Sequence, residues 1–190
     1  MNAVVQFLSQ ARSRSKENSD SLELLHQHGK YGVCIGLLRQ ELDTLIRLSY
    51  LWHEDTSEEE AIRLMQQSVA GTLWSKLTPN GKTIRITDRE MVNLASHLGG
   101  WELAIYEFGS KLIHLSDFHL YDSIDPVAGL TAEAREMLGG YMAFHHGWRG
   151  TDLTFKDLID NLPKIMKKLT DNVEFYIEEL EERYVPAAAP

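Results

Sequence analysis

The stretch over residues 31–53, YGVCIGLLRQELDTLIRLSYLWH, decides the fold class of this chain. Its apolar residues recur at spacings of three and four positions. Because an α-helix turns once in about 3.6 residues, this spacing gathers them on one face. The stretch therefore predicts a long helix with one face buried against other elements. The residues of this stripe are Tyr31, Cys34, Ile35, Leu38, Leu42, Leu45, Leu48 and Trp52.

Helical patterns continue on both sides of this stretch. A stripe from Phe155 to Tyr184 predicts one long C-terminal helix, with Pro163 as the place for a kink or a restart. Residues 83–85 are the only strand candidate, and nothing obvious in the sequence pairs with them, so an extended loop fits this segment equally well. The chain is therefore expected to be all-α, a single-domain bundle of about six to seven helices. The other expected helices cover residues 1–16, 21–27 (after a polar break at 18–20), 57–77, 87–99, 101–115 and 131–146.

The composition fits a single soluble domain. Of 190 residues, 43% are hydrophobic and 25% are charged, and this balance excludes wholesale disorder, collagen and a membrane bundle. We expect one domain over residues 1–185 and a flexible tail over residues 186–190. A lone cysteine and the absence of a signal-peptide pattern favour a reducing, cytoplasmic setting. No apolar run is long enough to span a membrane.

Acidic residues outnumber basic ones, with 28 Asp and Glu against 19 Lys and Arg and a formal net charge of −9. This negative charge excludes a protein that binds nucleic acid over its whole surface. The acidic residues concentrate in segments such as 54–60 and 171–182, whereas Arg39 and Arg47 lie together on a different helix. A small local anion site therefore remains compatible with the sequence.

Two polar features stand out in the expected helix over residues 31–53. Arg39, Asp43 and Arg47 are spaced by four and form a ladder along one side, which by itself indicates a salt-bridged, solvated face. Glu41 instead falls inside the apolar arc. A buried carboxylate is costly unless it is paired, so Glu41 is expected to meet an Arg or His from another helix or to lie at a cavity.

Two short segments resemble HEPN-like bacterial proteins. Residues 35–51, IGLLRQELDTLIRLSYL, resemble a helix that carries Arg-x3-acid between apolar runs, although Asp43 stands where Glu is commoner. Residues 111–116, KLIHLS, are similar to a later helix that ends in a His followed by a small polar residue. The chain departs from classical HEPN nucleases because it lacks Arg-x(4 to 6)-His near the start of its last long helix. Arg47 and His53 have an Arg-x5-His spacing, but on another helix.

The resemblance implies a polar constellation of Arg39, Asp43, His114 and Ser116 between two packed helices. In that arrangement Asp43 orients Arg39, His114 is the acid or base for an RNA 2′-hydroxyl, and Arg39 stabilises phosphate charge. The resemblance implies a metal-independent ribonuclease that acts in stress or phage defence and binds RNA at a local site. Arg47 and His53 are the second pair of candidate catalytic residues. The same residues also suit a structural network that holds two helices together.

Several histidines make a metal-binding site a further possibility. His114, Asp117 and His119 are close in sequence, but two histidines five positions apart reach one ion only if the helix ends between them. His145 and His146 are adjacent, so at most one of them is expected to point inward. Packing and hydrogen bonding account for these residues, and the sequence indicates no cofactor. A metal-binding bundle would use His114, Asp117, His119 and His145.

A third function class is a non-catalytic interaction module. The acidic stretch over residues 171–182 has no basic residue, which suits either a partner-binding face or a plain solvated one. An apolar helix face would make a homodimer or dock another protein. Under either class of function, Glu41, Asp117 and His119 are expected to be substrate-binding or structural polar residues.

Two further histidines, His26 and His28, lie at the expected end of the helix over residues 21–27. A partly charged imidazole there meets the negative end of the helix dipole. We therefore expect both histidines to cap that helix.

Overall fold

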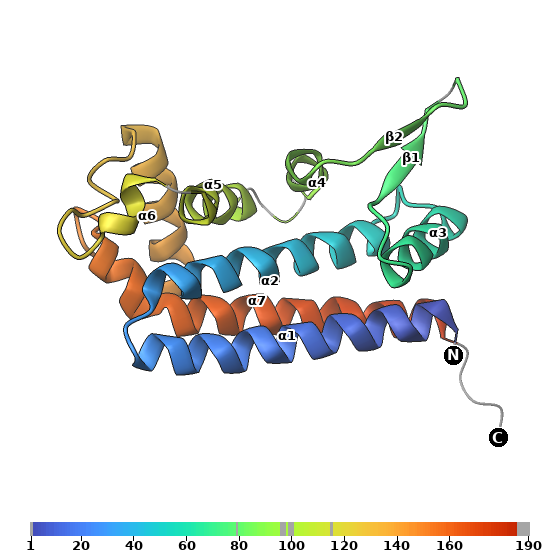
Figure 1. Ribbon diagram of the computed structural model, residues 1–190, viewed down its shortest axis with the longest axis horizontal. Helices are drawn as coiled ribbons and strands as arrows, with labels where there is room; N and C mark the ends of the chain where they lie inside the picture. Colours follow the sequence, from blue (N-terminus) through green and yellow to red (C-terminus); the bar gives the residue numbers. More distant parts are fainter. Residues whose placement is uncertain (1, 79, 96–97, 99–100, 115, 186–190) are drawn as a thin grey trace.

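The computed structural model describes residues 2–185 except 79, 96–97, 99–100 and 115, and it confirms the all-α fold. Figure 1 shows a bundle of helices with one small hairpin that projects from it. The predicted tail over residues 186–190 lies outside the described residues. The elements are α1 (Ala3–Gln27), α2 (Tyr31–Trp52), α3 (Glu58–Val69), β1 (Ser75–Leu77), β2 (Thr83–Arg85), α4 (Asp88–Leu94), α5 (Trp101–Ile113), the 3-10 helix η2 (Asp117–Leu120), α6 (Ala132–His146) and α7 (Phe155–Tyr184).

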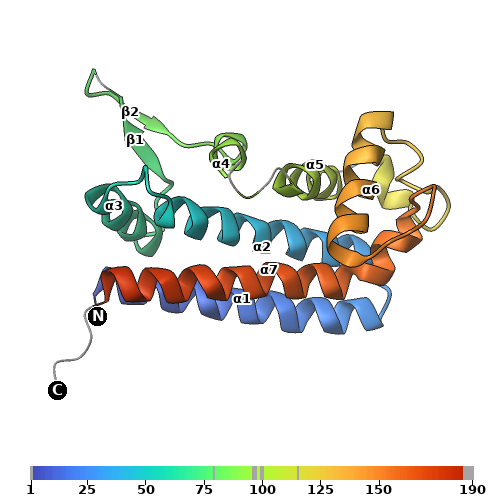
Figure 2. The ribbon, with the colours of Figure 1, turned by 180° about the vertical axis from the view of Figure 1, so that it is seen from behind.

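Three long helices, α1, α2 and α7, lie side by side and form the body of the bundle (Figures 1 and 2). The apolar stripe of α2 is buried against the other two, and Leu42, Leu45 and Leu48 have no exposed surface. Burying such a side chain contributes about 1.5–3 kcal/mol relative to leaving it in water. The predicted stripe of α2 therefore supplies the centre of the core.

Ion pairs join α1 to α7 along their outer edge. Arg12 Nη2 lies 2.7 Å from Glu174 Oε1, and its Nη1 lies 3.0 Å from Glu181 Oε1. These side chains are partly exposed, so the ion pairs add modestly to the apolar packing. The first and the last described helices thus pack directly on each other.

The polar break predicted at residues 18–20 is wrong, because α1 is one helix from Ala3 to Gln27. Ser15 and Asn18 point into the interface with α2, where both are buried. Their side chains donate hydrogen bonds to Glu41. Because these polar groups find a partner inside the bundle, they do not interrupt the helix.

The restart considered at Pro163 is also wrong, since α7 continues through this residue. Proline has no amide hydrogen, so the carbonyl oxygen of Ile159, four residues earlier, loses its helical donor. His26 Nε2 of α1 lies 2.7 Å from that oxygen and replaces the missing donor. His26 therefore completes α7 rather than capping its own helix, whereas His28 Nδ1 bonds the Leu24 carbonyl at the end of α1, as expected.

The strand candidate over residues 83–85 does have a partner. β1 pairs with β2 in antiparallel register, with Lys76 opposite Ile84. The partner was hidden because residues 57–77 read as one helix, whereas α3 ends at Val69 and the chain turns at Gly71, whose φ of +68° suits glycine. Of the helix expected over residues 87–99, the structure describes α4, which covers Asp88–Leu94.

Among the described residues, no helix is long and apolar enough to cross a membrane.

Candidate functional site

Glu41 lies at the centre of the α1–α2 interface and has no exposed surface. Ser15 Oγ donates to Glu41 Oε1 at 2.5 Å, and Asn18 Nδ2 donates to Oε2 at 2.9 Å. These partners are neutral donors, not the arginine or histidine that the sequence suggested. This network joins two helices of the core, and Glu41 does not line any of the pockets described below.

Arg39 is buried between α2 and α5, away from the solvated face expected for it. Its guanidinium carbon lies 4.2 Å from the centre of the Tyr106 ring, a cation–π contact. Gly109 of α5 packs on the Arg39 stem, because a Cβ at that position would lie 3.3 Å from Arg39 Cβ. The arginine is therefore part of the contact between two helices.

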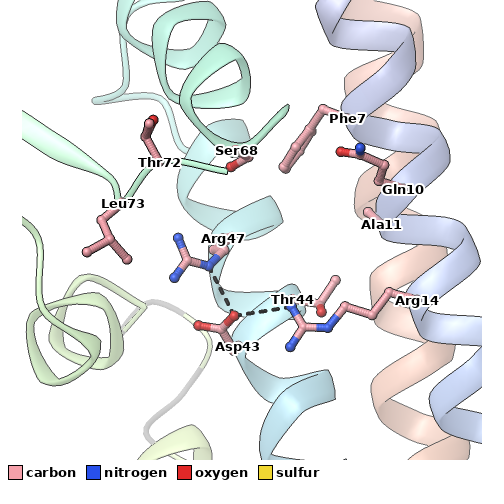
Figure 3. Close-up of a pocket in the computed structure, with 10 residues that line it drawn as sticks. All are labelled: Phe7, Gln10, Ala11, Arg14, Asp43, Thr44, Arg47, Ser68, Thr72 and Leu73. Carbon is pink, nitrogen blue, oxygen red and sulfur yellow. Dashed lines mark hydrogen bonds and ion pairs between the residues drawn. The ribbon is translucent and has the colours of Figure 1, made fainter. Parts of the chain in front are cut away.

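Asp43 and Arg47, one turn further along α2, do share a site (Figure 3). Arg47 Nε donates to Asp43 Oδ2 at 3.1 Å, and Arg14 Nη1 of α1 approaches the same oxygen at 3.5 Å. Arg47 also lies over the Trp74 ring, 4.9 Å from its centre. One carboxylate thus holds two arginines that come from different helices.

These residues line a pocket of about 300 Å³ between α1, α2 and the end of α3, which we call the Asp43 pocket. Figure 3 shows the terminal nitrogens of Arg47 pointing away from the Asp43 carboxylate. Two guanidinium groups face one carboxylate, so the pocket is positive on an acidic molecule. The remaining lining residues are polar or apolar but uncharged: Phe7, Gln10, Ala11, Thr44, Ser68, Thr72 and Leu73.

The segment after α5 holds most of the other candidates. His114 is exposed near the end of α5, and Ser116 Oγ donates to the Lys111 carbonyl at 2.6 Å. His119 is exposed as well and forms a capping box with Ser116 at the start of η2. The side chain of Asp117 lies outside what the structure describes. These contacts give Ser116 and His119 a local structural role in ending one helix and starting the next.

His53 lies just beyond the end of α2. Its Nδ1 accepts a hydrogen bond from the Asp55 amide at 3.3 Å and lies 3.5 Å from the Asp55 carboxylate. Among the residues that the structure describes, no histidine lines the Asp43 pocket. The geometry therefore brings Asp43 and Arg47 together but places His53, His114 and Arg39 elsewhere.

The described residues do not form the metal-binding group that the sequence left open. Within the described part of the chain, no three His, Cys, Asp or Glu side chains lie close enough to hold one ion. His146 Nε2 instead lies 3.0 Å from the Tyr141 hydroxyl, and His145 packs edge-on against Phe144.

Of the pocket's lining residues, the sequence singled out only Asp43 and Arg47, and Arg14 and Gln10 are among those that it missed. They are four residues apart and share a face of α1, which is a weak signal shared by many surface helices. What makes them part of a site is the packing of α1 against α2. That packing is a tertiary relationship, and the local pattern does not contain it.

Comparison of the chain with models of protein families, with curated proteins and with solved structures finds no match.

Proposed function

We propose that this protein binds a nucleotide phosphate, free or within RNA, in the Asp43 pocket, and that Arg14 and Arg47 are the anion-binding residues. The observation that carries the proposal is the convergence of two arginines from α1 and α2 on the single carboxylate of Asp43. A guanidinium has five N–H donors, so each arginine keeps donors for a ligand after its contact with Asp43.

The size and the walls of the pocket fit such a ligand. A volume of about 300 Å³ lies at the lower end of the range typical of small-molecule sites. Phe7 and Leu73 supply apolar surface for a base or a sugar. Gln10, Thr44 and Ser68 supply amide and hydroxyl groups that exchange hydrogen bonds with a ligand.

The proposal is binding rather than cleavage. RNA cleavage without a metal needs a general acid or base within hydrogen-bond reach of the 2′-hydroxyl. The described residues of the pocket include no imidazole, and the only carboxylate is Asp43, which is held by two arginines. The resemblance of residues 35–51 to HEPN-like proteins supports RNA as the source of the phosphate, and Asp43 belongs to that resemblance.

A dimerisation module is less well supported by the surface. In the part of the chain that the structure describes, the large exposed apolar side chains are spread over several elements instead of forming the one helix face that a dimer of the expected kind requires. They include Val5 and Leu24 in α1, Val33 in α2, Ile113 in α5, Phe144 in α6 and Phe175 in α7.

Fluorescence anisotropy with a labelled single-stranded RNA octamer tests the proposal, with AMP as competitor. Arg14→Gln and Arg47→Gln are each expected to weaken binding at least about tenfold, because each removes a charge-assisted hydrogen bond. Arg149→Gln, at an exposed arginine outside the pocket, is the matched control and should bind as the unmodified protein does.

The two sources of phosphate give different competition. Displacement of RNA by AMP indicates a mononucleotide site, whereas RNA binding that AMP does not displace indicates that the strand itself is required. Gel analysis of the same RNA after incubation is expected to show it intact. Equal affinities of the Arg14, Arg47 and Arg149 variants would overturn the proposal.

A further inference from the structure

One long segment of this acidic chain carries no acidic residue. Residues 61–87 contain neither Asp nor Glu. Their basic residues are Arg63, Lys76, Lys82 and Arg85. The last three belong to the hairpin of β1 and β2, residues 75–85, which we call the basic arm. Figure 1 shows this hairpin projecting from the body of the bundle. The basic arm is thus a local concentration of positive charge on a molecule whose formal net charge is −9.

The three cations of the basic arm differ in their surroundings. Lys76 Nζ forms an ion pair with Glu90 of α4, and this contact holds the arm to the helix that follows it. In β2 the side chain of Ile84 is half-buried, whereas Arg85 lies on the exposed face of the strand, and Lys82 is exposed just before it. In the part of the chain that the structure describes, neither Lys82 nor Arg85 forms an ion pair. These two cations are therefore available to an anionic ligand.

The basic arm begins at the wall of the Asp43 pocket. Thr72 and Leu73 line that pocket, and β1 starts shortly after them at Ser75. Between them lies Trp74, which is buried. Its ring centre lies 4.9 Å from the guanidinium carbon of Arg47, one of the two arginines of the pocket. The base of the arm is thus packed against the anion-binding side chain itself.

The pairing of the two strands sets the order of the cations along the arm. Arg85 lies opposite Ser75, at the base of the arm. Lys82 lies nearer the tip, where its carbonyl oxygen accepts a hydrogen bond from the Thr78 amide at 2.8 Å. Because a strand rises about 3.4 Å per residue, the backbones of these two basic residues are about 10 Å apart along β2. Arg47, Arg85 and Lys82 therefore follow one another from the pocket toward the tip.

We propose that the basic arm binds the phosphate backbone of a single-stranded RNA that extends from the Asp43 pocket, with Arg85 and Lys82 as the contacting residues. The inference rests on the function proposed above and deepens it, because it makes an RNA strand, not a free nucleotide, the ligand. A row of cations neutralises successive phosphates of a strand, whereas a mononucleotide in the pocket does not extend along the arm.

The surroundings of the arm suit such a strand. The lack of acidic residues over residues 61–87 removes the repulsion that a polyanion meets at the acidic segments elsewhere in the chain. A nucleotide held between α1 and α2 has no room for a paired base, so the strand is single. The arm contains no aromatic residue on which a base could stack. Its contacts are therefore with the backbone and do not depend on the base sequence.

Fluorescence anisotropy of the full chain with the labelled RNA octamer, repeated over a series of salt concentrations, tests the inference. At low salt the double variant Lys82→Gln/Arg85→Gln is expected to bind the octamer at least about tenfold more weakly, because it loses two phosphate contacts. Its plot of log K against log salt should be shallower by about 1.4, since each contact with a single strand contributes about 0.7. Calorimetry with AMP should give the same result for this variant as for the unmodified protein.

Two further variants make the result specific to the arm. Lys156→Gln/Lys167→Gln removes the same charge from exposed lysines of α7, and it should leave the affinity for the octamer and the salt dependence unchanged. Lys82→Arg/Arg85→Lys keeps both charges and should bind the octamer nearly as the unmodified protein does. Thermal unfolding of each variant checks that it is folded.

The outcomes separate this inference from the function on which it rests. If Arg47→Gln weakens binding of the octamer but Lys82→Gln/Arg85→Gln changes neither its affinity nor the salt dependence, the inference alone is overturned. The arm would then be left to another partner, such as an acidic protein surface. If Arg47→Gln binds the octamer as tightly as the unmodified protein, or the unmodified protein does not bind it, the proposed function fails and the inference is overturned with it.

Discussion

His26 Nε2 lies 2.7 Å from the carbonyl oxygen of Ile159, and this contact joins α1 to the one carbonyl of α7 that Pro163 deprives of its helical donor. The contact places the ring proton on Nε2. A proline inside a helix and a histidine 137 positions earlier in the chain thus form one structural unit.

His26→Ala is expected to lower the free energy of unfolding by about 1–3 kcal/mol, because it leaves the Ile159 carbonyl without a donor. In a Pro163→Ala background the same change should cost markedly less, since the introduced alanine supplies the amide that proline lacks. Urea denaturation of the four proteins in a double-mutant cycle measures the coupling. Equal costs of His26→Ala in the two backgrounds would contradict this account.

The sequence predicted the fold where the pattern is local and failed where it depends on packing. The stripe of α2 is a property of one segment, and the periodicity therefore revealed it. The continuity of α1 through Asn18 depends on Glu41 of another helix, and the continuity of α7 through Pro163 depends on His26. Neither contact is visible in a window of neighbouring residues.

The candidate site divides in the same way. The i, i+4 pair of Asp43 and Arg47 follows from helix geometry and is present. Arg14 joins it only because α1 packs on α2 in one register. The resemblance to HEPN-like proteins grouped Arg39 with His114, but Arg39 is buried against Tyr106 whereas His114 is exposed. Whether those residues act on RNA stays a prediction.

Glu41→Leu is expected to cost about 2–4 kcal/mol of folding free energy, because it leaves the buried donors of Ser15 and Asn18 unsatisfied. The triple variant Ser15→Ala/Asn18→Ala/Glu41→Leu should recover part of this loss, since it removes the donors together with the acceptor. Glu17→Gln, at an exposed carboxylate of α1, is the control. Purely additive costs in chemical denaturation would show that the three side chains do not act as a network.

Gly36 and Gly109 provide a matched pair of glycines inside helices. Among the described residues, no atom outside its own helix lies within 4 Å of a Cβ built at Gly36, so Gly36→Ala should stabilise the protein by about 1 kcal/mol. At Gly109 the added Cβ meets the Arg39 stem at 3.3 Å. The free energy of unfolding of Gly109→Ala should therefore lie below that of Gly36→Ala by about 1 kcal/mol or more. A difference of that size makes Gly109→Ala neutral or destabilising relative to the unmodified protein. Thermal unfolding of the two variants compares them, and equal gains would show that α5 is not held close to Arg39.

His146 is expected to make the protein sensitive to mild acid. Its pKa is lowered to about 4 in the folded chain by burial and by the nearby charges of His145, Lys168 and Lys164. Between about pH 6.5 and pH 4 the unfolded imidazole takes up a proton that the folded one does not, so stability falls as the pH falls through this window.

His146→Gln should therefore reduce the loss of stability between pH 7 and pH 5 by about 1 kcal/mol, less than the full shift implies because solvent screens the half-buried ring. Glutamine can still bond the Tyr141 hydroxyl. Urea denaturation at the two pH values measures the difference, and His114→Gln, at an exposed histidine, is the control. An unchanged pH dependence in His146→Gln would assign the acid sensitivity to other groups.

The direct packing of α1 on α7 has a consequence for the order of assembly. Arg12 and its partners Glu174 and Glu181 are separated by more than 160 positions, and the apolar face of α1 is covered by the same distant helix. During synthesis α1 and α2 leave the ribosome long before α7, so we expect them to pair first and to keep one apolar face in water. Completion of the bundle is then expected to wait for the closure of a very large loop, which should slow folding relative to a bundle of sequential neighbours.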